Sequence, residues 1–147
     1  MASKPGGDNL IDEKAAEHTD RPVFSATYAA EPTAVGTIRA ALVAFATEAG
    51  VSKSQIEAVR LAASEAATNA VVHAYEPGGA GAIDVSAELE DCVLTILFED
   101  AGPGLGTRSP RPGLGVGLTV IGRLANHVAL STSGAGGLRL VMSFDRQ

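Results

Sequence analysis

The sequence predicts an α+β fold in which helices cover one face of a β-sheet, as a two-layer α/β sandwich. Stretches with the apolar spacing of helices occur together with short strand-like runs, and most of these runs are joined in pairs by tight turns. Each of these elements has one apolar face, and a helical layer packed on a sheet buries all of the apolar faces together. A doubly wound α/β fold is the alternative, but this chain lacks the strict alternation of strands and helices that such a fold requires.

Size and charge limit the classes of protein to consider. The chain has 147 residues, of which 46% are hydrophobic, so it can bury the core of one domain without disulfides. Its net charge of −6 argues against binding to nucleic acid or an anionic membrane surface but leaves room for a small anionic ligand. The single cysteine, Cys92, lies in an apolar run and is expected to be a buried structural thiol. Because the sequence shows neither a membrane helix nor a secretory signal, we expect a cytoplasmic protein.

The chain divides into a tail and a domain. Residues 1–21 are rich in Gly, Asp, Glu and Lys with almost no apolar periodicity, which predicts a flexible acidic tail. The domain is expected over residues 22–147. It begins with polar and apolar residues that alternate over Val23–Ala29, which predicts a strand, and Pro32 prevents its continuation.

Two helices are expected next. Apolar residues recur at helical spacing over Thr33–Ala49, and Gly50 is a favourable residue at which to end a helix. Ser52 is a natural N-cap, with Gln55 at the capping-box position three residues later. The alanine-rich run that follows predicts a second helix of roughly twenty residues, ending at about Tyr75.

The rest of the domain is expected to contain two hairpins separated by a loop and a short helix. The first hairpin joins the strands Ile83–Leu89 and Val93–Glu99 at Glu90-Asp91. The later elements are a Gly/Pro-rich loop at Asp100–Gly115, a third helix at Leu118–Ala125, and the final strands Val128–Thr132 and Leu138–Phe144.

Two polar residues of the second helix fall on its apolar side. On a helical wheel, Glu65 and Asn69 lie one turn apart within the apolar region that Leu61 and Val72 extend. A buried carboxylate is unfavourable without a partner. One explanation is an internal salt bridge for Glu65 and a backbone hydrogen bond for Asn69. The other is that Asn69 offers its carbonyl oxygen to a hard metal ion such as Mg²⁺ while Glu65 acts as a general base. The wheel alone leaves both explanations open.

A carboxylate followed by glycines ends the third predicted strand. Asp100 precedes Gly102 and Gly104, and a further glycine follows at Gly106. A carboxylate in this place can accept a hydrogen bond from the amino group of a flat heterocycle, and glycines let the ring approach the backbone. A simple tight turn after a strand is the alternative interpretation.

A second glycine-rich segment leads into the third predicted helix. Gly113, Gly115 and Gly117 precede Leu118, and such an approach exposes backbone N–H groups to a phosphate. A flexible loop is the alternative. A P-loop is excluded because no lysine lies beside a glycine-rich loop, and the dinucleotide pattern is excluded because Leu118 replaces its third glycine.

In order and spacing, three segments resemble the N box and the two glycine boxes of the GHKL ATP-binding superfamily. These segments are 65–75, 100–104 and 113–118. The His-Ala-Tyr that ends the first segment, together with the small size, resembles the anti-sigma factor serine kinases. The resemblance covers about residues 22–144. It implies a Bergerat-type ATP-binding fold, with a mixed, mostly antiparallel sheet covered by three helices.

The resemblance implies a role for each of these boxes. It implies ATP between the helices and the sheet, Mg²⁺ on Asn69, and the adenine amino group on Asp100. Glu65 would take the proton of a serine hydroxyl as that hydroxyl attacks the γ-phosphate. His73 is expected to pack at the helix end rather than act in catalysis. The implied nucleotide-binding residues of the glycine boxes are Gly102, Gly104, Gly113, Gly115, Gly117 and Leu118.

The sequence departs from the family pattern in two places. The last hairpin usually carries a Gly-Thr that supports adenine binding, whereas residues 134–137 here are Gly-Ala-Gly-Gly, so the contact is lost or moves to Thr132. The lid over residues 105–112 is short. Its candidate phosphate partners are Arg108 and Arg111, for which a solvated loop charge is the alternative.

The resemblance implies a protein-serine kinase that is also an anti-sigma factor. Its partners would be a sigma factor and a STAS-type anti-anti-sigma antagonist, with no direct contact to nucleic acid or membrane, and we allow for a homodimer. A regulatory protein that binds ATP without transferring phosphate is the alternative, but such a protein would not need Glu65 as a base. The catalytic domain of a histidine kinase is disfavoured because residues 1–21 are too few and too polar to supply dimerising phospho-acceptor helices.

Overall fold

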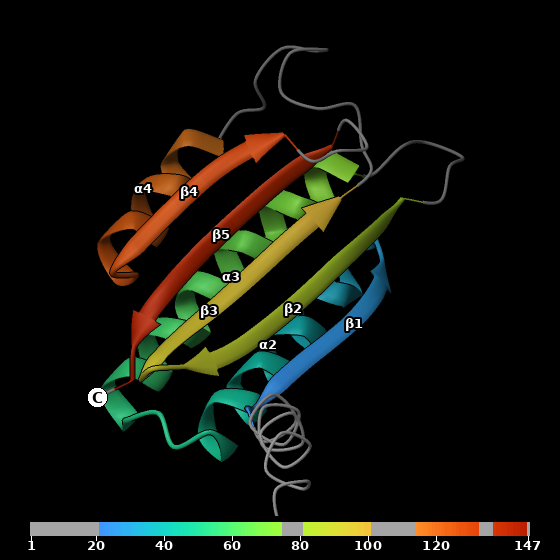
Figure 1. Ribbon diagram of the computed structural model, residues 1–147. Helices are drawn as coiled ribbons and strands as arrows, with labels where there is room; N and C mark the ends of the chain where they lie inside the picture. Colours follow the sequence, from blue (N-terminus) through green and yellow to red (C-terminus); the bar gives the residue numbers. More distant parts are fainter. Residues whose placement is uncertain (1–20, 75–80, 101–113, 133–136, 147) are drawn as a thin grey trace, which may run out of the picture.

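Helices cover one face of a single five-stranded sheet in the computed structural model (Figure 1), as the predicted two-layer architecture requires. The structure describes residues 21–74, 81–100, 114–132 and 137–146. The strand order is β1-β2-β3-β5-β4, and each of the four pairings is antiparallel. The expected mixed sheet is therefore wrong for the described strands: hairpin connections pair neighbours antiparallel, and β5 also enters antiparallel to β3.

The predicted strands are confirmed, and their ends shift by no more than one residue. Side chains alternate between the helix-covered face and the open face, which makes such strands recognisable in the sequence. The strands are β1 (Val23–Ala29), β2 (Ala82–Glu90), β3 (Val93–Asp100), β4 (His127–Thr132) and β5 (Leu138–Asp145).

The first two helices form where the sequence predicts them. Helix α2 (Thr33–Glu48) is followed by Gly50 at a φ of 85°, the left-handed conformation that glycine adopts at helix ends. Helix α3 (Lys53–Ala74) is capped by Ser52, whose Oγ accepts a hydrogen bond from the Gln55 N–H at 3.3 Å. The Gln55 side chain does not complete a capping box, because it donates to the Asp145 carbonyl at 2.6 Å. The start of α3 is thus tied to the end of β5.

The third helix begins earlier than predicted. Helix α4 spans Leu114–Leu124, whereas the sequence predicted a start at Leu118, so Gly115 and Gly117 lie inside the helix rather than in the loop before it. Glycine disfavours a helix interior by about 1 kcal/mol relative to alanine. For this reason the sequence pattern predicted that the helix begins only after these glycines. Packing against α3 and burial of Ile121 compensate for this cost.

The core lies between α3 and the middle strands. Helix α3 contacts α2, α4, β2, β3 and β5, so it forms the centre of the helical layer (Figure 1). The largest fully buried side chains come from both layers: Ile38, Leu42, Val59, Ile83, Val85, Leu94, Ile96, Ile121, Met142 and Phe144. Within the described ranges, no helix combines the length and apolarity needed to cross a membrane.

Two expectations about apolar side chains are wrong. Leu61 and Val72 do not extend the buried side of α3, because they are 52% and 42% exposed. The sheet, α2 and α4 cover a narrower arc of α3 than the wheel suggested. Cys92 is exposed rather than buried, because it lies in the hairpin turn that joins β2 to β3. Since Glu90 pairs with Val93, the turn residues are Asp91 and Cys92, one position later than predicted.

Candidate functional site

Helix α3 presents three polar residues in one row. Glu65, Asn69 and His73 are spaced four residues apart, so they follow one another along the same face. Glu65 and Asn69 are half-buried and His73 is buried. This row runs toward the end of α3.

Helix α4 packs closely on this row through a glycine. A Cβ on Gly117 would lie 2.8 Å from Nδ2 of Asn69 and 3.1 Å from Oε1 of Glu65, which is closer than side chains normally approach. The sequence predicted Gly117 as a phosphate-binding residue in a loop. The structure instead places it within α4, directly against the two polar residues of α3.

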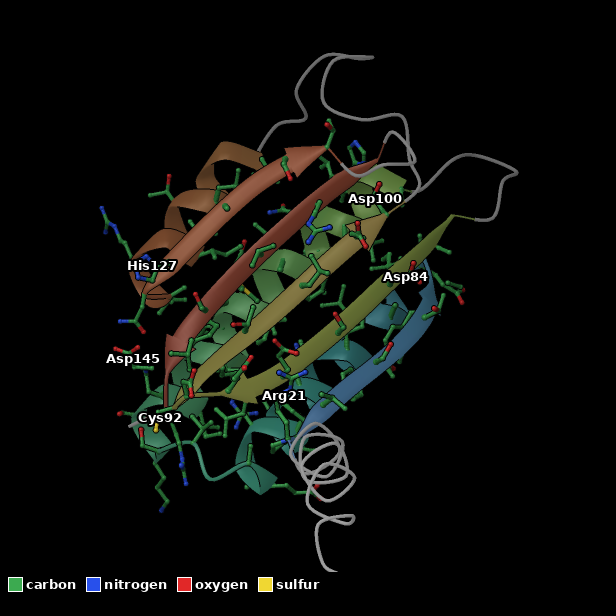
Figure 2. All side chains as sticks on the ribbon, in the orientation of Figure 1. Arg21, Asp84, Cys92, Asp100, His127 and Asp145 are labelled. Atoms are coloured by element: carbon green, nitrogen blue, oxygen red, sulfur yellow. The ribbon has the colours of Figure 1, made fainter. Side chains whose placement is uncertain are left out.

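The Asp100 carboxylate is buried at the end of β3, with its side chain 2% exposed. Nδ1 of His73 lies 3.0 Å from Oδ1 and 3.1 Å from Oδ2 of Asp100. The Leu138 N–H donates to Oδ1 at 3.3 Å. These donors from α3 and β5 offset the unfavourable burial of a carboxylate. Figure 2 shows that Asp100 lies at the opposite end of the sheet from Cys92 and Asp145.

Gly137 allows β5 to begin beside Asp100. A Cβ at this position would overlap the backbone carbonyl oxygen of Asp100 and would lie 2.8 Å from its Oδ1. Glycine is therefore the residue that lets the Leu138 N–H reach the carboxylate. This contact depends on the backbone and leaves no hydrophobic or charge pattern in the sequence.

A small cavity connects the candidate residues of α3, β3 and α4. Asn69, Asp100 and Leu118 line it together, and its volume is about 20 Å³. That volume is comparable to the space needed by one water molecule. Its remaining lining residues are apolar: Ala66, Ala70, Phe98, Leu130, Leu138 and Leu140. The cavity therefore combines apolar walls with an amide and a carboxylate.

Two buried nitrogen atoms near this cavity have no hydrogen-bond partner within the described ranges. They are Nδ2 of Asn69 and Nε2 of His73. Glu65 also forms no ion pair with another described residue. The described residues therefore give no support to a salt bridge for Glu65. A buried polar atom without a hydrogen-bond partner is unfavourable, so Nδ2 of Asn69 is available to donate a hydrogen bond to a ligand.

The other predicted site residues are placed only in part. Gly115 lies in the first turn of α4. Thr132 is the exposed last residue of β4, opposite Leu138, and does not line the cavity. The remaining predicted residues lie outside the described residues: Gly102, Gly104, Arg108, Arg111 and Gly113.

Sequence reasoning missed the contact between His73 and Asp100. The expectation of a packing role at the helix end fits its burial but not its pairing with a carboxylate 27 positions away. A signal was present, because His73 continues the four-residue spacing of Glu65 and Asn69. That spacing would have placed it on the same face of α3 as the other two.

Comparisons with known proteins identify relatives that match more than half of this chain. The histidine kinase-like ATPase domain family matches residues 28–144. The anti-sigma F factor of Clostridium acetobutylicum is 31% identical over 115 residues, which cover 71% of this chain and 80% of that protein. The serine-protein kinase RsbW of Bacillus licheniformis is 37% identical over 86 residues, which cover 58% of this chain and 54% of that kinase.

A solved structure shows the same arrangement. The crystal structure of the RsbU and RsbW domains of a Mycobacterium tuberculosis protein has a TM-score of 0.66 and 27% sequence identity to this chain. The match covers 84% of this chain but 32% of the mycobacterial chain. This chain therefore spans about half of the Bacillus kinase and a third of the mycobacterial chain, but four fifths of the clostridial factor.

Proposed function

Because this chain belongs to the histidine kinase-like ATPase domain family, we propose that it binds ATP with Mg²⁺ as a protein-serine kinase that is also an anti-sigma factor. The observation that carries the proposal is that the structure brings the side chains of Glu65, Asn69 and Asp100 close to one another. Gly117 packs against both Glu65 and Asn69, and Asn69 shares a cavity with Asp100. The names of the relatives, an anti-sigma F factor and a serine-protein kinase, supply the activity and the first partner.

The cavity fits the edge of an adenine ring in its chemistry. Apolar side chains suit the faces of a flat heterocycle, and the Asp100 carboxylate suits its exocyclic amino group, which donates hydrogen bonds. At about 20 Å³ the cavity is much smaller than a nucleobase, so the proposal requires α4 and the sheet to separate when ATP enters. Leu118 of α4 is the lining residue that such a movement would displace.

The donor set also fits Mg²⁺. The described residues contain no cluster of three or more His, Cys, Asp or Glu side chains that could hold a metal ion by themselves. Mg²⁺ usually takes one or two protein oxygens and completes its coordination with water and substrate phosphates. Asn69, which lines the cavity together with Asp100, would hold the ion through its carbonyl oxygen. The bound ion would neutralise charge on the phosphates.

Glu65 is the proposed general base. Its carboxylate lies one helical turn from Asn69, and it forms no ion pair with another described residue that would occupy it. It would accept the proton of a serine hydroxyl on the protein substrate. A regulatory protein that only binds ATP would need Asn69 and Asp100 but not Glu65, so the half-buried carboxylate favours the kinase.

The remaining parts of the proposal concern the phosphates and the partners. We assign the phosphates to Arg108, Arg111, Gly113 and Gly115, the close approach of the adenine ring to Gly102 and Gly104, and a supporting adenine contact to Thr132. The partners would be a sigma factor and a STAS-type anti-anti-sigma protein, and two copies of the domain over residues 22–147 would form a homodimer. Binding of a sigma factor would place the protein in the cytoplasm, where transcription occurs.

The decisive experiment separates phosphate transfer from nucleotide binding. The protein is mixed with labelled ATP, Mg²⁺ and its candidate antagonist. We expect Glu65→Gln to reduce transfer by about 10²–10⁴-fold, the usual contribution of a general base. The same variant should still be stabilised against heat by Mg-ATP. Glu57→Gln is the matched control, because Glu57 lies on the same helix and pairs with Arg60 at 3.0 Å.

Two further variants test the nucleotide site itself. Asn69→Ala and Asp100→Asn should each lose most of the thermal stabilisation that Mg-ATP gives. Unchanged transfer in Glu65→Gln would disprove the general base, and unchanged stabilisation in the other two variants would disprove the ATP site.

A further inference from the structure

His73 lies near the closely packed end of α3. Helix α3 ends one residue later at Ala74, and Gly81 packs so closely there that a Cβ would overlap the Ala74 carbonyl oxygen. The Gly81 carbonyl in turn accepts a hydrogen bond from the Ala30 N–H at 2.9 Å. The His73 side chain itself is 7% exposed. The imidazole is therefore held both by its own burial and by the backbone around it.

The contacts of Asp100 define which nitrogen of His73 carries the proton. An ionised carboxylate only accepts hydrogen bonds, and Oδ1 of Asp100 already accepts the Leu138 N–H. The imidazole must then donate from Nδ1, which lies almost equally far from both carboxylate oxygens, at 3.0 and 3.1 Å. In the neutral ring this leaves Nε2 as an acceptor, and Nε2 is buried without a partner in the described part of the chain.

We propose that His73 is a positioning residue that orients the Asp100 carboxylate and thereby gives the site its preference for adenine over bases with a carbonyl group at the same position. This inference rests on the proposed ATP site. Adenine presents an amino group that donates, whereas hypoxanthine presents a carbonyl oxygen that only accepts. A carboxylate held in one orientation accepts a hydrogen bond from the adenine amino group and repels the carbonyl oxygen of hypoxanthine. A carboxylate that can rotate discriminates less between the two bases.

The cost of burying Nε2 supports a positioning role. A buried nitrogen without a hydrogen-bond partner is unfavourable. Nε2 of His73 is such an atom among the described residues, and the same ring places Nδ1 within hydrogen-bond distance of both oxygens of Asp100. Gly137 and the Leu138 N–H approach the same carboxylate from β5. Two elements far apart in the sequence thus orient one acceptor at the wall of the cavity.

The test compares two amide variants with different reach. In His73→Asn, the amide nitrogen can occupy the position of Nδ1 and still donate to Asp100. In His73→Gln, the amide lies one bond further out, near the position of Nε2. His73→Leu removes the donor while keeping a side chain of similar size. Affinities of the full-length protein for Mg-ATP and Mg-ITP are measured by calorimetry for the wild type and each variant.

We expect His73→Leu and His73→Gln to weaken Mg-ATP binding by about tenfold, the loss expected for one hydrogen bond to a charged group. Mg-ITP binding should change much less, so the preference for ATP falls. His73→Asn should recover most of that preference. Val59→Ala is the stability control, because Val59 is fully buried in α3 and does not line the cavity. It should lower the melting temperature without changing the ratio of the two affinities.

The possible results separate the inference from the proposed function. An ATP to ITP ratio that is the same in the wild type, His73→Gln and His73→Asn would overturn the positioning role. The two amide variants decide this even if His73→Leu does not fold. A wild-type protein that binds neither nucleotide would overturn the proposed ATP site itself, and this inference with it.

A measurement on the nucleotide-free protein provides a readout that does not depend on activity. Nitrogen NMR of the imidazole should show a proton on Nδ1 of His73, and Asp100→Asn should alter the Nδ1 signal. His127, which is exposed on β4, serves as the internal reference. A proton on Nε2 of neutral His73 would contradict the hydrogen bond on which the inference depends.

Discussion

At the scale of single residues, the contact between α3 and α4 depends on the missing side chain of Gly117. The Asn69 amide and the Glu65 carboxylate occupy the space that a Cβ would need. Any side chain here must push the two polar groups away from α4 or push α4 away from them. The position of both groups is therefore sensitive to one methyl group on a neighbouring helix.

We predict that Gly117→Ala weakens Mg-ATP binding by about tenfold, equivalent to about 1.4 kcal/mol, because it displaces the Asn69 amide. The affinity is measured by calorimetry or by displacement of a fluorescent nucleotide.

Gly122→Ala is the matched control, because it lies on the same helix and its Cβ would meet nothing within 4 Å. It should instead stabilise the protein by about 0.5–1 kcal/mol through better helix propensity. If the two alanine variants bind nucleotide equally well, Gly117 has no special place in the site.

The sequence predicted part of the site at this scale. Glu65 and Asn69 were visible because polar residues on an apolar helix face are unusual, and Asp100 was visible because glycines follow it at the end of a strand. The contribution of the Leu138 N–H could not be predicted, because it depends on which strand lies beside β3 and on the close approach of Gly137. No local pattern encodes that neighbour.

At the scale of elements, the hairpin between β2 and β3 turns in two residues that adopt left-handed conformations. Asp91 has a φ of 55° and Cys92 a φ of 66°. Two-residue hairpins favour this conformation because it matches the twist of the strands, and glycine is the preferred second residue. Aspartate tolerates the left-handed region, whereas cysteine is strained there. The Cys92 carbonyl also accepts the Arg146 N–H at 2.9 Å, which ties the turn to the chain after β5.

We predict that Cys92→Gly raises the free energy of unfolding by about 0.5–1 kcal/mol, since relief of left-handed strain exceeds the entropic cost of glycine. The free energy of unfolding is measured by denaturant titration, with the same dependence on denaturant concentration fitted to the wild type and the variants. Cys92→Ser keeps the Cβ and should leave the stability nearly unchanged. A serine variant that gains as much as the glycine variant would show that the thiol, and not the backbone, is the source of the strain.

Strand ends were easier to predict than the start of α4. The open face of the sheet keeps polar residues in alternation with apolar ones, so the period of two marks the strands clearly. The start of α4 has two glycines in its first turns, and local propensity opposes a helix there. Tertiary contact with α3 overrides this propensity, and such contact is absent from any short window of sequence.

At the scale of the whole molecule, the proposed boundary between tail and domain lies beside Arg21. This residue pairs with Glu90 at 2.9 Å and with Glu88 at 3.8 Å, so the described chain is tied to β2 just before β1 begins. Both pairs are partly exposed and therefore contribute little to stability.

We predict that removal of residues 1–20 changes the free energy of unfolding by no more than about 0.5 kcal/mol. A further deletion that removes Arg21 should cost up to about 1 kcal/mol more, the range of exposed salt bridges. Urea unfolding of the full chain and of the two truncated chains provides the comparison. A large loss of stability or of Mg-ATP binding in the first truncation would show that residues 1–20 belong to the folded domain.

The position of β5 has a consequence for how the protein is made. The last strand of the chain fills the gap between β3 and β4, and its first residue donates to Asp100. During synthesis, β3 leaves the ribosome well before β5 does, and long-range strand pairing of this kind forms late. A growing chain thus lacks the Leu138 contact and two walls of the cavity until β5 emerges. Only a fully synthesised domain can acquire the nucleotide that we propose it binds.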